Sequence, residues 1–231
     1  QVLSVVRNAD LILIVLDPEE MRYDEITDEV YKAGLRTDIK PPNMKIEKKE
    51  RGGINISSTV DLEIGEDTIK GLMKQNGYTN AEVIIREQMD HDRFIDGLMD
   101  NRKYLPSVEA VNKSDLLDED EREQYGQKYD VLISAETGEN LDQLKELIFE
   151  RMGLIRVYMK EKGSEPDKDE PLILREGEKV EDALAELPGD MKDRFKHARV
   201  TGPSSKFPEQ KVGVEHELMD EDILQLNLRH I

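Results

Sequence analysis

Continuous apolar runs alternate with amphipathic or polar stretches in two parts of this chain of 231 residues. LILIVLD at 11–17 precedes a polar stretch at about 19–33, and the strand-forming residues 104–111 precede an acidic stretch at 118–128. Apolar runs that contain β-branched residues are typical of strands buried on both faces of a parallel sheet, and the stretches between them predict helices. A further strand, VLIS, and a helix from about residue 139 repeat this order. The pattern therefore predicts an α/β fold with a doubly wound parallel sheet.

Between these parts, residues 35–95 follow a different pattern. INISSTVDLEI at 54–64 alternates strictly between apolar and polar positions, which predicts a strand with one face exposed to solvent. A short helix at 66–76 and a strand at 81–86 follow, so this segment predicts a small inserted α+β domain. The glycines of RGG at 51–53 fit either a close backbone approach to phosphate or a hairpin turn.

The pattern changes again near residue 155. Two short strands, IRVYMK and LILREG, precede a helix at about 180–198 that is interrupted at Pro188-Gly189. Three more short strands, ARVTG, KVGVEHEL and DILQLNL, complete the order of a β-grasp domain. We therefore expect three parts: residues 1–34 with 96–153 in the parallel-sheet domain, 35–95 in the insert, and 154–231 in the β-grasp domain.

The end of the first apolar run carries one polar candidate. Asp17 follows the strand at the position where parallel strands deliver side chains to a ligand crevice, and it also precedes a predicted helix. We expect it to cap that helix.

Composition narrows the class of protein. The chain has no cysteine, which excludes disulfides and thiolate metal sites, and no apolar run approaches the length of a membrane span. We therefore expect a cytoplasmic protein without a membrane partner. The 52 acidic and 33 basic residues give a formal charge of −19. We interpret this excess as adaptation to a high-salt, halophilic cytoplasm, with an acidic mesophilic protein as the alternative.

Two basic segments interrupt this acidic background. Residues 36–51 hold six basic and three acidic residues, and residues 192–211 hold six basic and two acidic ones. Such segments are candidate contacts for RNA phosphates, although an ordinary solvated face explains them equally well. The candidate RNA contacts are Lys45, Lys48, Lys49, Arg51, Lys196, Arg199, Lys206 and Lys211.

The strand at 104–111 leads into Asn112-Lys113-Ser114-Asp115, the Asn-Lys-x-Asp pattern of guanine-nucleotide-binding proteins. The Asp115 carboxylate can accept hydrogen bonds from the ring N–H and the exocyclic amine of guanine. Adenine lacks that pair of donors, so the site would discriminate against it. Asn112 would tie the loop to neighbouring backbone and approach the base, and the Lys113 stem would lie along the face of the base. An ordinary Asn/Asp turn after a strand is the alternative.

A second short motif favours the guanine interpretation. Ser134-Ala135-Glu136 follows the next strand, about twenty residues after the first motif and with one intervening helix. Backbone N–H groups at this place, that of Ala135 above all, would meet the guanine oxygen. The sequence therefore predicts a guanine-binding site composed of Asn112, Lys113, Asp115, Ser134, Ala135 and Glu136.

Other chemistry finds little support in the sequence. His91, His197, His216 and His230 lack metal-ligand spacing, and no Gly-x-Ser-x-Gly elbow occurs. We predict no catalytic and no metal-binding residue in this chain.

Longer stretches carry a resemblance to a known family. ADLILIVLD, KPPN with RGGINISSTV, AEVIIRE and NRKYLPSVEAVNKSD resemble the developmentally regulated GTP-binding proteins, which are Obg-related, translation-factor-like GTPases, and the chain looks like an archaeal member. The tail from ILREGEKVEDAL to VGVEHELMDEDIL resembles a TGS domain, the ubiquitin-like module shared with threonyl-tRNA and alarmone synthetases.

The resemblance implies a parent protein that binds GTP and GDP, uses Mg²⁺, hydrolyses GTP and works with ribosomes, RNA or a protein partner. The GxxxxGK[ST] phosphate loop does not occur in these residues. We therefore expect the chain to be the C-terminal part of such a GTPase, with the base-reading residues but without the magnesium ligands, and inactive alone. A non-enzymatic module that binds RNA, ribosomes or a protein is the alternative.

Overall fold

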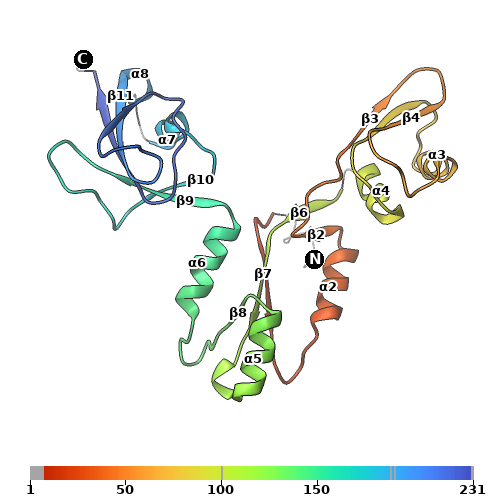
Figure 1. Ribbon diagram of the computed structural model, residues 1–231, viewed down its shortest axis with the longest axis horizontal. Helices are drawn as coiled ribbons and strands as arrows, with labels where there is room; N and C mark the ends of the chain where they lie inside the picture. The colour runs from red at the N-terminus through yellow and green to blue at the C-terminus, as the bar shows by residue number, and fades with distance from the viewer. Residues whose placement is uncertain (1–7, 100, 188, 190, 230–231) are drawn as a thin grey trace. The chain divides into compact units, whose positions relative to one another are not determined.

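The computed structural model describes residues 8–99, 101–187, 189 and 191–229 (Figure 1). The chain divides into two compact units, residues 1–112 and 113–231. No helix in these described ranges is both long enough and apolar enough to cross a bilayer.

The first unit contains three small groups of paired strands with helices between them. Its elements are β1 (Ile12–Leu16), α2 (Tyr23–Lys32), β2 (Leu35–Thr37), β3 (Met44–Lys48), β4 (Ile54–Ser58), α3 (Glu66–Gln75), β5 (Ala81–Ile85), α4 (His91–Leu98), β6 (Lys103–Leu105) and β7 (Ser107–Val111).

β1 and β7 form a parallel pair in which Ile12 lies opposite Ser107 and Leu16 opposite Val111. The burial of the two strands differs. On β7 the apolar residues are buried, whereas on β1 only Ile14 and Leu16 are, and Leu13 and Val15 are 40% and 49% exposed. The prediction that the first strand is buried on both faces is therefore wrong for the described residues. Successive side chains of a strand point to opposite faces. The rest of the described chain covers the face of β1 that carries Ile14 and Leu16 and leaves the face of Leu13 and Val15 partly exposed.

Asp17 also differs from its prediction. Its carboxylate accepts a hydrogen bond from the Glu19 N–H at 3.0 Å. The helix begins only at Tyr23, after Arg22 in the N-cap position. Asp17 therefore closes a turn that delays the helix, and it does not cap it.

The insert is built on a sheet of order β3-β5-β4, in which β5 pairs antiparallel with β3 and parallel with β4. The central strand is the most buried, and Val83 and Ile85 pack with Ile69 and Met73 of α3 and Phe94 of α4. The predicted helix at 66–76 and strand at 81–86 match α3 and β5. β3 was not predicted, because the charged residues of MKIEK hide its pattern.

The order of this sheet excludes one of the two interpretations of RGG, the hairpin turn, and the approach to phosphate stays a prediction. β3 and β4 lie on opposite sides of β5, so the loop between them is not a hairpin, and that prediction is wrong. Gly52 and Gly53 have φ angles of 107° and 72°, which glycine adopts without strain. The Gly53 N–H donates to Asn80 Oδ1 at 2.8 Å, which fixes the start of β4 beside β5. β4 also ends sooner than predicted, because Ser58 Oγ bonds the Val60 backbone and closes a turn.

The second unit begins with short elements and continues into a five-stranded sheet. Its elements are η1 (Ser114–Leu116), α5 (Glu119–Lys128), β8 (Val131–Leu132), α6 (Leu141–Arg151), β9 (Leu154–Met159), β10 (Leu172–Arg175), α7 (Val180–Glu186), α8 (Met191–Arg194), β11 (Phe195–Thr201), β12 (Gln210–Val212) and β13 (Asp222–Leu228).

The strand order of the sheet is β10-β9-β13-β11-β12, with β9 and β13 parallel and the other neighbours antiparallel. One face packs on α7, and its core includes Val157, Leu184, Val200 and Leu224, all at most 3% exposed. This arrangement of two strands, a helix and further strands is that of a β-grasp fold.

The interrupted helix predicted at 180–198 is present as α7 and the short α8, but it ends at Arg194. α7 stops at Glu186, Pro188 lies outside the described residues, and β11 already begins at Phe195. Pairing with β13 buries Ala198 and Val200, and this tertiary pairing outweighs the helical pattern of the segment. Of the predicted strand KVGVEHEL, only the start is in β12.

Candidate functional site

The Asn-Lys-x-Asp loop leaves β7 through a tight backbone turn. The Asn112 N–H donates to the Leu16 carbonyl at 2.9 Å, which anchors the last residue of the first unit. Lys113 has a φ angle of 60°, in the left-handed region, and η1 follows directly. Ser114 is fully buried, whereas Asp115 is exposed. The turn thus buries the variable position of the motif and presents the aspartate that is predicted to read the base.

The Ser-Ala-Glu loop is a closed turn in the second unit. Ser134 is fully buried; its Oγ accepts a hydrogen bond from the Thr137 N–H at 3.1 Å, and its own N–H donates to the Glu139 carbonyl at 3.1 Å. Ala135 and Glu136 lie exposed at the tip of this turn. Ser134 therefore acts as the internal support of the loop, and its two neighbours form the outward surface.

A cluster of three residues joins the two loops. Ser114 Oγ donates to Glu139 Oε2 at 2.6 Å, and Arg122 Nη1 donates to Glu139 Oε1 at 2.9 Å. Arg122 Nη2 also donates to the Ser114 carbonyl at 2.7 Å. These hydrogen bonds lower the pKa of Glu139 to about 2, first through Arg122 and then through Ser114. The structure therefore ties together the two motifs that the sequence connects only by their order.

Sequence reasoning missed Glu139 and Arg122. Arg122 is the single basic residue among the many acidic residues of 117–127, and that isolation was an available signal. Glu139 carried no comparable signal, because acidic residues are common throughout the chain.

The exposed carboxylate of Asp115 is chemically suited to its predicted role. Among the residues that the structure describes, it accepts no hydrogen bond, and the nearby Arg122 interacts with it only through its charge. An ionised carboxylate has two oxygens that can accept a pair of parallel N–H donors. The arrangement can therefore receive the ring N–H and exocyclic amine of a guanine. The guanine-binding roles of all six residues stay predictions: Asn112, Lys113, Asp115, Ser134, Ala135 and Glu136.

Two lysines of the first basic segment pair with neighbouring carboxylates. Glu47 lies 2.6 Å from Lys45 Nζ and 3.1 Å from Lys49 Nζ, and the two lysines lower its pKa to about 2. The Lys48 ammonium lies 5.1 Å from the centre of the Tyr78 ring. Arg51 is exposed. Three of the four candidate RNA contacts in this segment thus already have partners within the unit.

The second basic segment is more open. Lys196, Arg199, Lys206 and Lys211 are all exposed, and Arg199 on β11 lies directly opposite Lys211 on β12. Arg199 also pairs with Glu209 at 3.1 Å. The pKa of His197 is lowered, first by burial and then by Lys211, Lys196 and Arg199. A positive potential therefore persists around these two strands.

Within residues 8–99, 101–187, 189 and 191–229, no three histidines or carboxylates converge in a way that suits a metal ion. His216 bonds Ser204 Oγ through Nε2 at 2.9 Å, and His230 lies outside those ranges.

Comparison with known proteins finds two family models. Residues 51–154 match the C-terminal region of the MMR_HSR1 domain, and residues 155–227 match the TGS domain. The predicted mixed α/β fold with a C-terminal TGS domain is thereby confirmed. The three-part division of the chain and its boundaries stay predictions.

Curated relatives match over nearly the whole chain. A GTP-binding protein of Halobacterium salinarum is 42% identical over 99% of this chain, and one of Methanocaldococcus jannaschii is 44% identical over 99%. Developmentally regulated GTP-binding protein 2 of Bos taurus is 34% identical over 98%. The chain spans 65%, 61% and 63% of the lengths of these three relatives. Through this end-to-end match and its TGS domain, the chain belongs to the family of developmentally regulated GTP-binding proteins.

Proposed function

We propose that this chain forms the guanine-recognition part of a GTP-binding protein. The observation that carries the proposal is the Ser114–Glu139–Arg122 cluster, because it holds the Asn-Lys-x-Asp loop and the Ser-Ala-Glu loop together in one place. Two loops that act on the same base must keep a fixed separation, and a charge-assisted cluster supplies that rigidity. The relatives, whose names describe GTP-binding proteins, support the same conclusion.

The selectivity would come from Asp115. Guanine offers its carboxylate two donors, whereas adenine offers an unprotonated ring nitrogen at the same place, so an adenine complex would leave the carboxylate unpaired. Most of the affinity for a nucleotide normally comes from its phosphates, and the GxxxxGK[ST] motif does not occur in these residues. We therefore expect selective but weak binding by the 231-residue chain.

The test is a titration of the ¹⁵N-labelled chain with GDP and, separately, with ADP. GDP is expected to shift the amide signals of residues 112–115 and 134–139 at millimolar concentration, and ADP is expected to leave them in place. Equal shifts with both nucleotides would contradict base recognition. Submicromolar GTP binding measured by calorimetry would contradict the assignment of affinity to phosphate contacts outside this sequence.

The proposal extends to the parent protein. There, GTP would be hydrolysed to GDP with the help of Mg²⁺, and this chain would contribute the base contacts while other residues bind the phosphates, the ion and the attacking water. Association with ribosomes in the cytoplasm is part of the same proposal.

A second candidate function is RNA binding by the β-grasp sheet. It is favoured by the exposed cations Lys196, Arg199 and Lys211 around β11 and β12, and by their lowering of the His197 pKa. Charge reversal at Lys196 and Lys206 is expected to weaken RNA association and to flatten its dependence on salt. The comparison reverses Lys48 and Lys49 in the first basic segment, where a smaller effect is expected because Lys49 pairs with Glu47 and Glu82 and Lys48 lies against the Tyr78 ring. Equal binding by all these variants would contradict the proposal.

A further inference from the structure

The strand β13 is longer than the stretch of it that β9 covers. β9 pairs only with Asp222, Ile223 and Leu224, although β13 continues to Leu228. The last bond across this pair runs from the Lys160 N–H to the Leu224 carbonyl at 3.0 Å. Because backbone groups of a strand alternate in direction, the N–H and C=O of Leu226 point to the same side as those of Leu224. Beyond Leu224, this edge of β13 therefore presents backbone groups that β9 does not pair.

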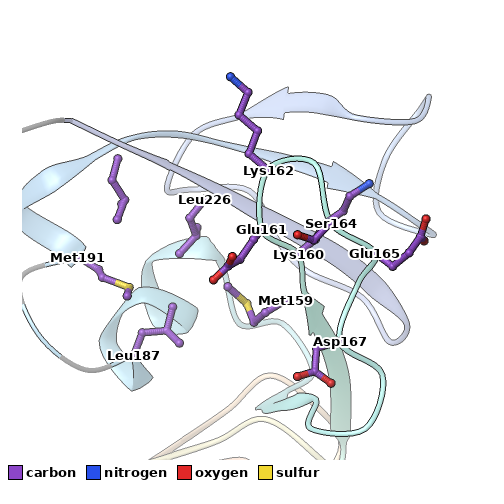
Figure 2. A pocket seen from close by; sticks show the side chains of 11 residues that line it. Met159, Lys160, Glu161, Lys162, Ser164, Glu165, Asp167, Leu187, Met191 and Leu226 are labelled. Atoms are coloured by element: carbon purple, nitrogen blue, oxygen red, sulfur yellow. The ribbon is translucent and has the colours of Figure 1, made fainter.

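A groove of about 760 Å³ borders this edge on the core side of the sheet. We call it the apolar groove because its wall on the side of the core is apolar, although its other wall is the charged loop that contains Glu161, Glu165 and Asp167. Figure 2 shows Met159, Leu187, Met191 and Leu226 around it, and Leu228 also lines it. These side chains come from β9, from the segment around α7 and α8, and from β13. The groove therefore offers an apolar pocket directly beside the uncovered edge.

A second groove, of about 510 Å³, borders the same stretch of β13 on the opposite face. Its lining is polar and includes Gln225 and Asn227, and its three cations, Lys160, Lys162 and Arg199, outnumber its two carboxylates, Glu165 and Glu209. The side-chain amide nitrogen of Asn227 is buried and forms no hydrogen bond with any residue that the structure describes. A buried donor without a partner is costly, so this nitrogen indicates a place where an acceptor from a ligand would be favourable.

The two grooves share one wall, and alternate side chains of β13 line the other wall of each. Residues of the loop after β9, including Lys160, Lys162 and Ser164, line both grooves. On β13, Leu226 faces the apolar groove and Asn227 the polar one. Open space therefore lies between this loop and β13 on both faces of the sheet, beside the edge at which a neighbouring strand would pair.

We propose that β13 binds an extended segment of a protein partner as an added strand, between its uncovered edge and the loop 160–165. The partner strand would pair with the backbone groups of Leu226, place alternate apolar side chains against Met159 and Met191, and place acidic side chains toward Lys162 and Asn227. The recognised chemistry is therefore a peptide in which apolar and acidic residues alternate.

The alternation favours a peptide over RNA for this site. Amide groups of the partner match the amide groups of β13 that β9 does not pair, and side chains at a period of two match one apolar and one polar groove. A nucleic acid would satisfy the cations of the polar groove but would leave the apolar groove unfilled. The two surfaces together therefore specify a strand.

The experiment uses the full chain and two synthetic seven-residue peptides of identical composition. In one, glutamate and valine alternate, and in the other the same residues are grouped in blocks. The alternating peptide is expected to bind at least about tenfold more tightly in fluorescence anisotropy and to slow hydrogen exchange at the Leu226 amide. Equal binding of the two peptides, or unchanged exchange at Leu226, would overturn the proposal.

Two variants, Met191→Glu and Lys162→Glu, locate the binding surface, and Phe207→Glu is their control. Met191→Glu puts a charge into the apolar groove and is expected to weaken binding of the alternating peptide about tenfold or more, whereas Phe207→Glu makes the same change at a site that is 60% exposed and outside both grooves. Lys162→Glu is expected to weaken binding without altering the core. Equal affinities for Met191→Glu and Phe207→Glu would overturn the proposal, and so would a uridine oligomer that protects Leu226 where the peptide does not.

Discussion

The hydroxyl of Ser114 donates a hydrogen bond of 2.6 Å to the carboxylate of Glu139, 25 residues further along the chain. Ser114 occupies the variable position of the Asn-Lys-x-Asp motif, and Glu139 closes the turn that begins at Ser134. Ser114 is buried and would not contact the base, but its side chain helps to hold the two loops together. Together with the hydrogen bond from the Ser114 N–H to the Ile133 carbonyl at 2.9 Å, the bond to Glu139 holds the loops of Asp115 and Ala135 side by side.

Glu139→Gln is expected to loosen both loops without unfolding the chain. Glutamine keeps an oxygen that accepts from Ser114, but it loses the charge that attracts Arg122. Faster hydrogen exchange in residues 134–139 and weaker GDP-induced shifts are the expected results. Glu119→Gln makes the same chemical change on the exposed first turn of α5 and serves as the control. Unchanged exchange in the Glu139 variant would show that the cluster does not hold the loops.

The same cluster predicts a dependence on pH. The pKa of Glu139 is lowered to about 2 from an ordinary value of 4.5, so the folded loops bind fewer protons than the unfolded ones as the pH falls. Its stabilising contribution is therefore complete above about pH 4.5 and is lost as the pH falls toward 2. Carboxyl ¹³C signals recorded from pH 6 to pH 2 would follow this titration directly. A midpoint near 4.5 would contradict the assigned hydrogen bonds.

Asp115→Asn is expected to exchange guanine selectivity for xanthine selectivity. The amide of asparagine offers one donor and one acceptor, and xanthine presents a carbonyl oxygen where guanine has its amine. GDP-induced shifts at residues 112–115 should fall below detection, and xanthosine diphosphate should produce shifts in their place. Asp118→Asn, at the N-cap of α5, is the control for a nearby change of charge, and it should retain the preference for GDP. A variant that still prefers GDP would remove Asp115 from the base site.

The elements that could be predicted from the sequence are those whose own residues carry a clear periodicity or helix caps. α3, β5 and α5 have clear periodicity or caps, and their observed limits lie close to the expected ones. β3 and β11 were missed or misplaced because pairing with distant strands, rather than local composition, makes them strands. The Asn-Lys-x-Asp and Ser-Ala-Glu motifs could be recognised for a similar reason, because each consists of consecutive residues. The bond between Ser114 and Glu139 depends on folding, and no local pattern indicates it.

A buried ion pair connects β2 with α4 in the first unit. Arg36 and Asp96 form a buried pair with an Nε–Oδ2 distance of 2.5 Å and side chains only 3% and 5% exposed, and Arg102 joins them at 2.8 Å. Arg36 therefore belongs to the interior and adds nothing to the basic surface that its segment suggested.

Asp96→Ala leaves two cations without their carboxylate, one of them buried, and should destabilise the unit by about 3–5 kcal/mol. Tyr104→Phe is the contrasting change nearby, because the buried Tyr104 hydroxyl forms no hydrogen bond with the described residues and its removal should cost less than about 1 kcal/mol. Urea-dependent hydrogen exchange of residues 81–98 in the full chain measures both values. Similar losses in the two variants would mean that packing, rather than the ion pair, holds α4 against β2.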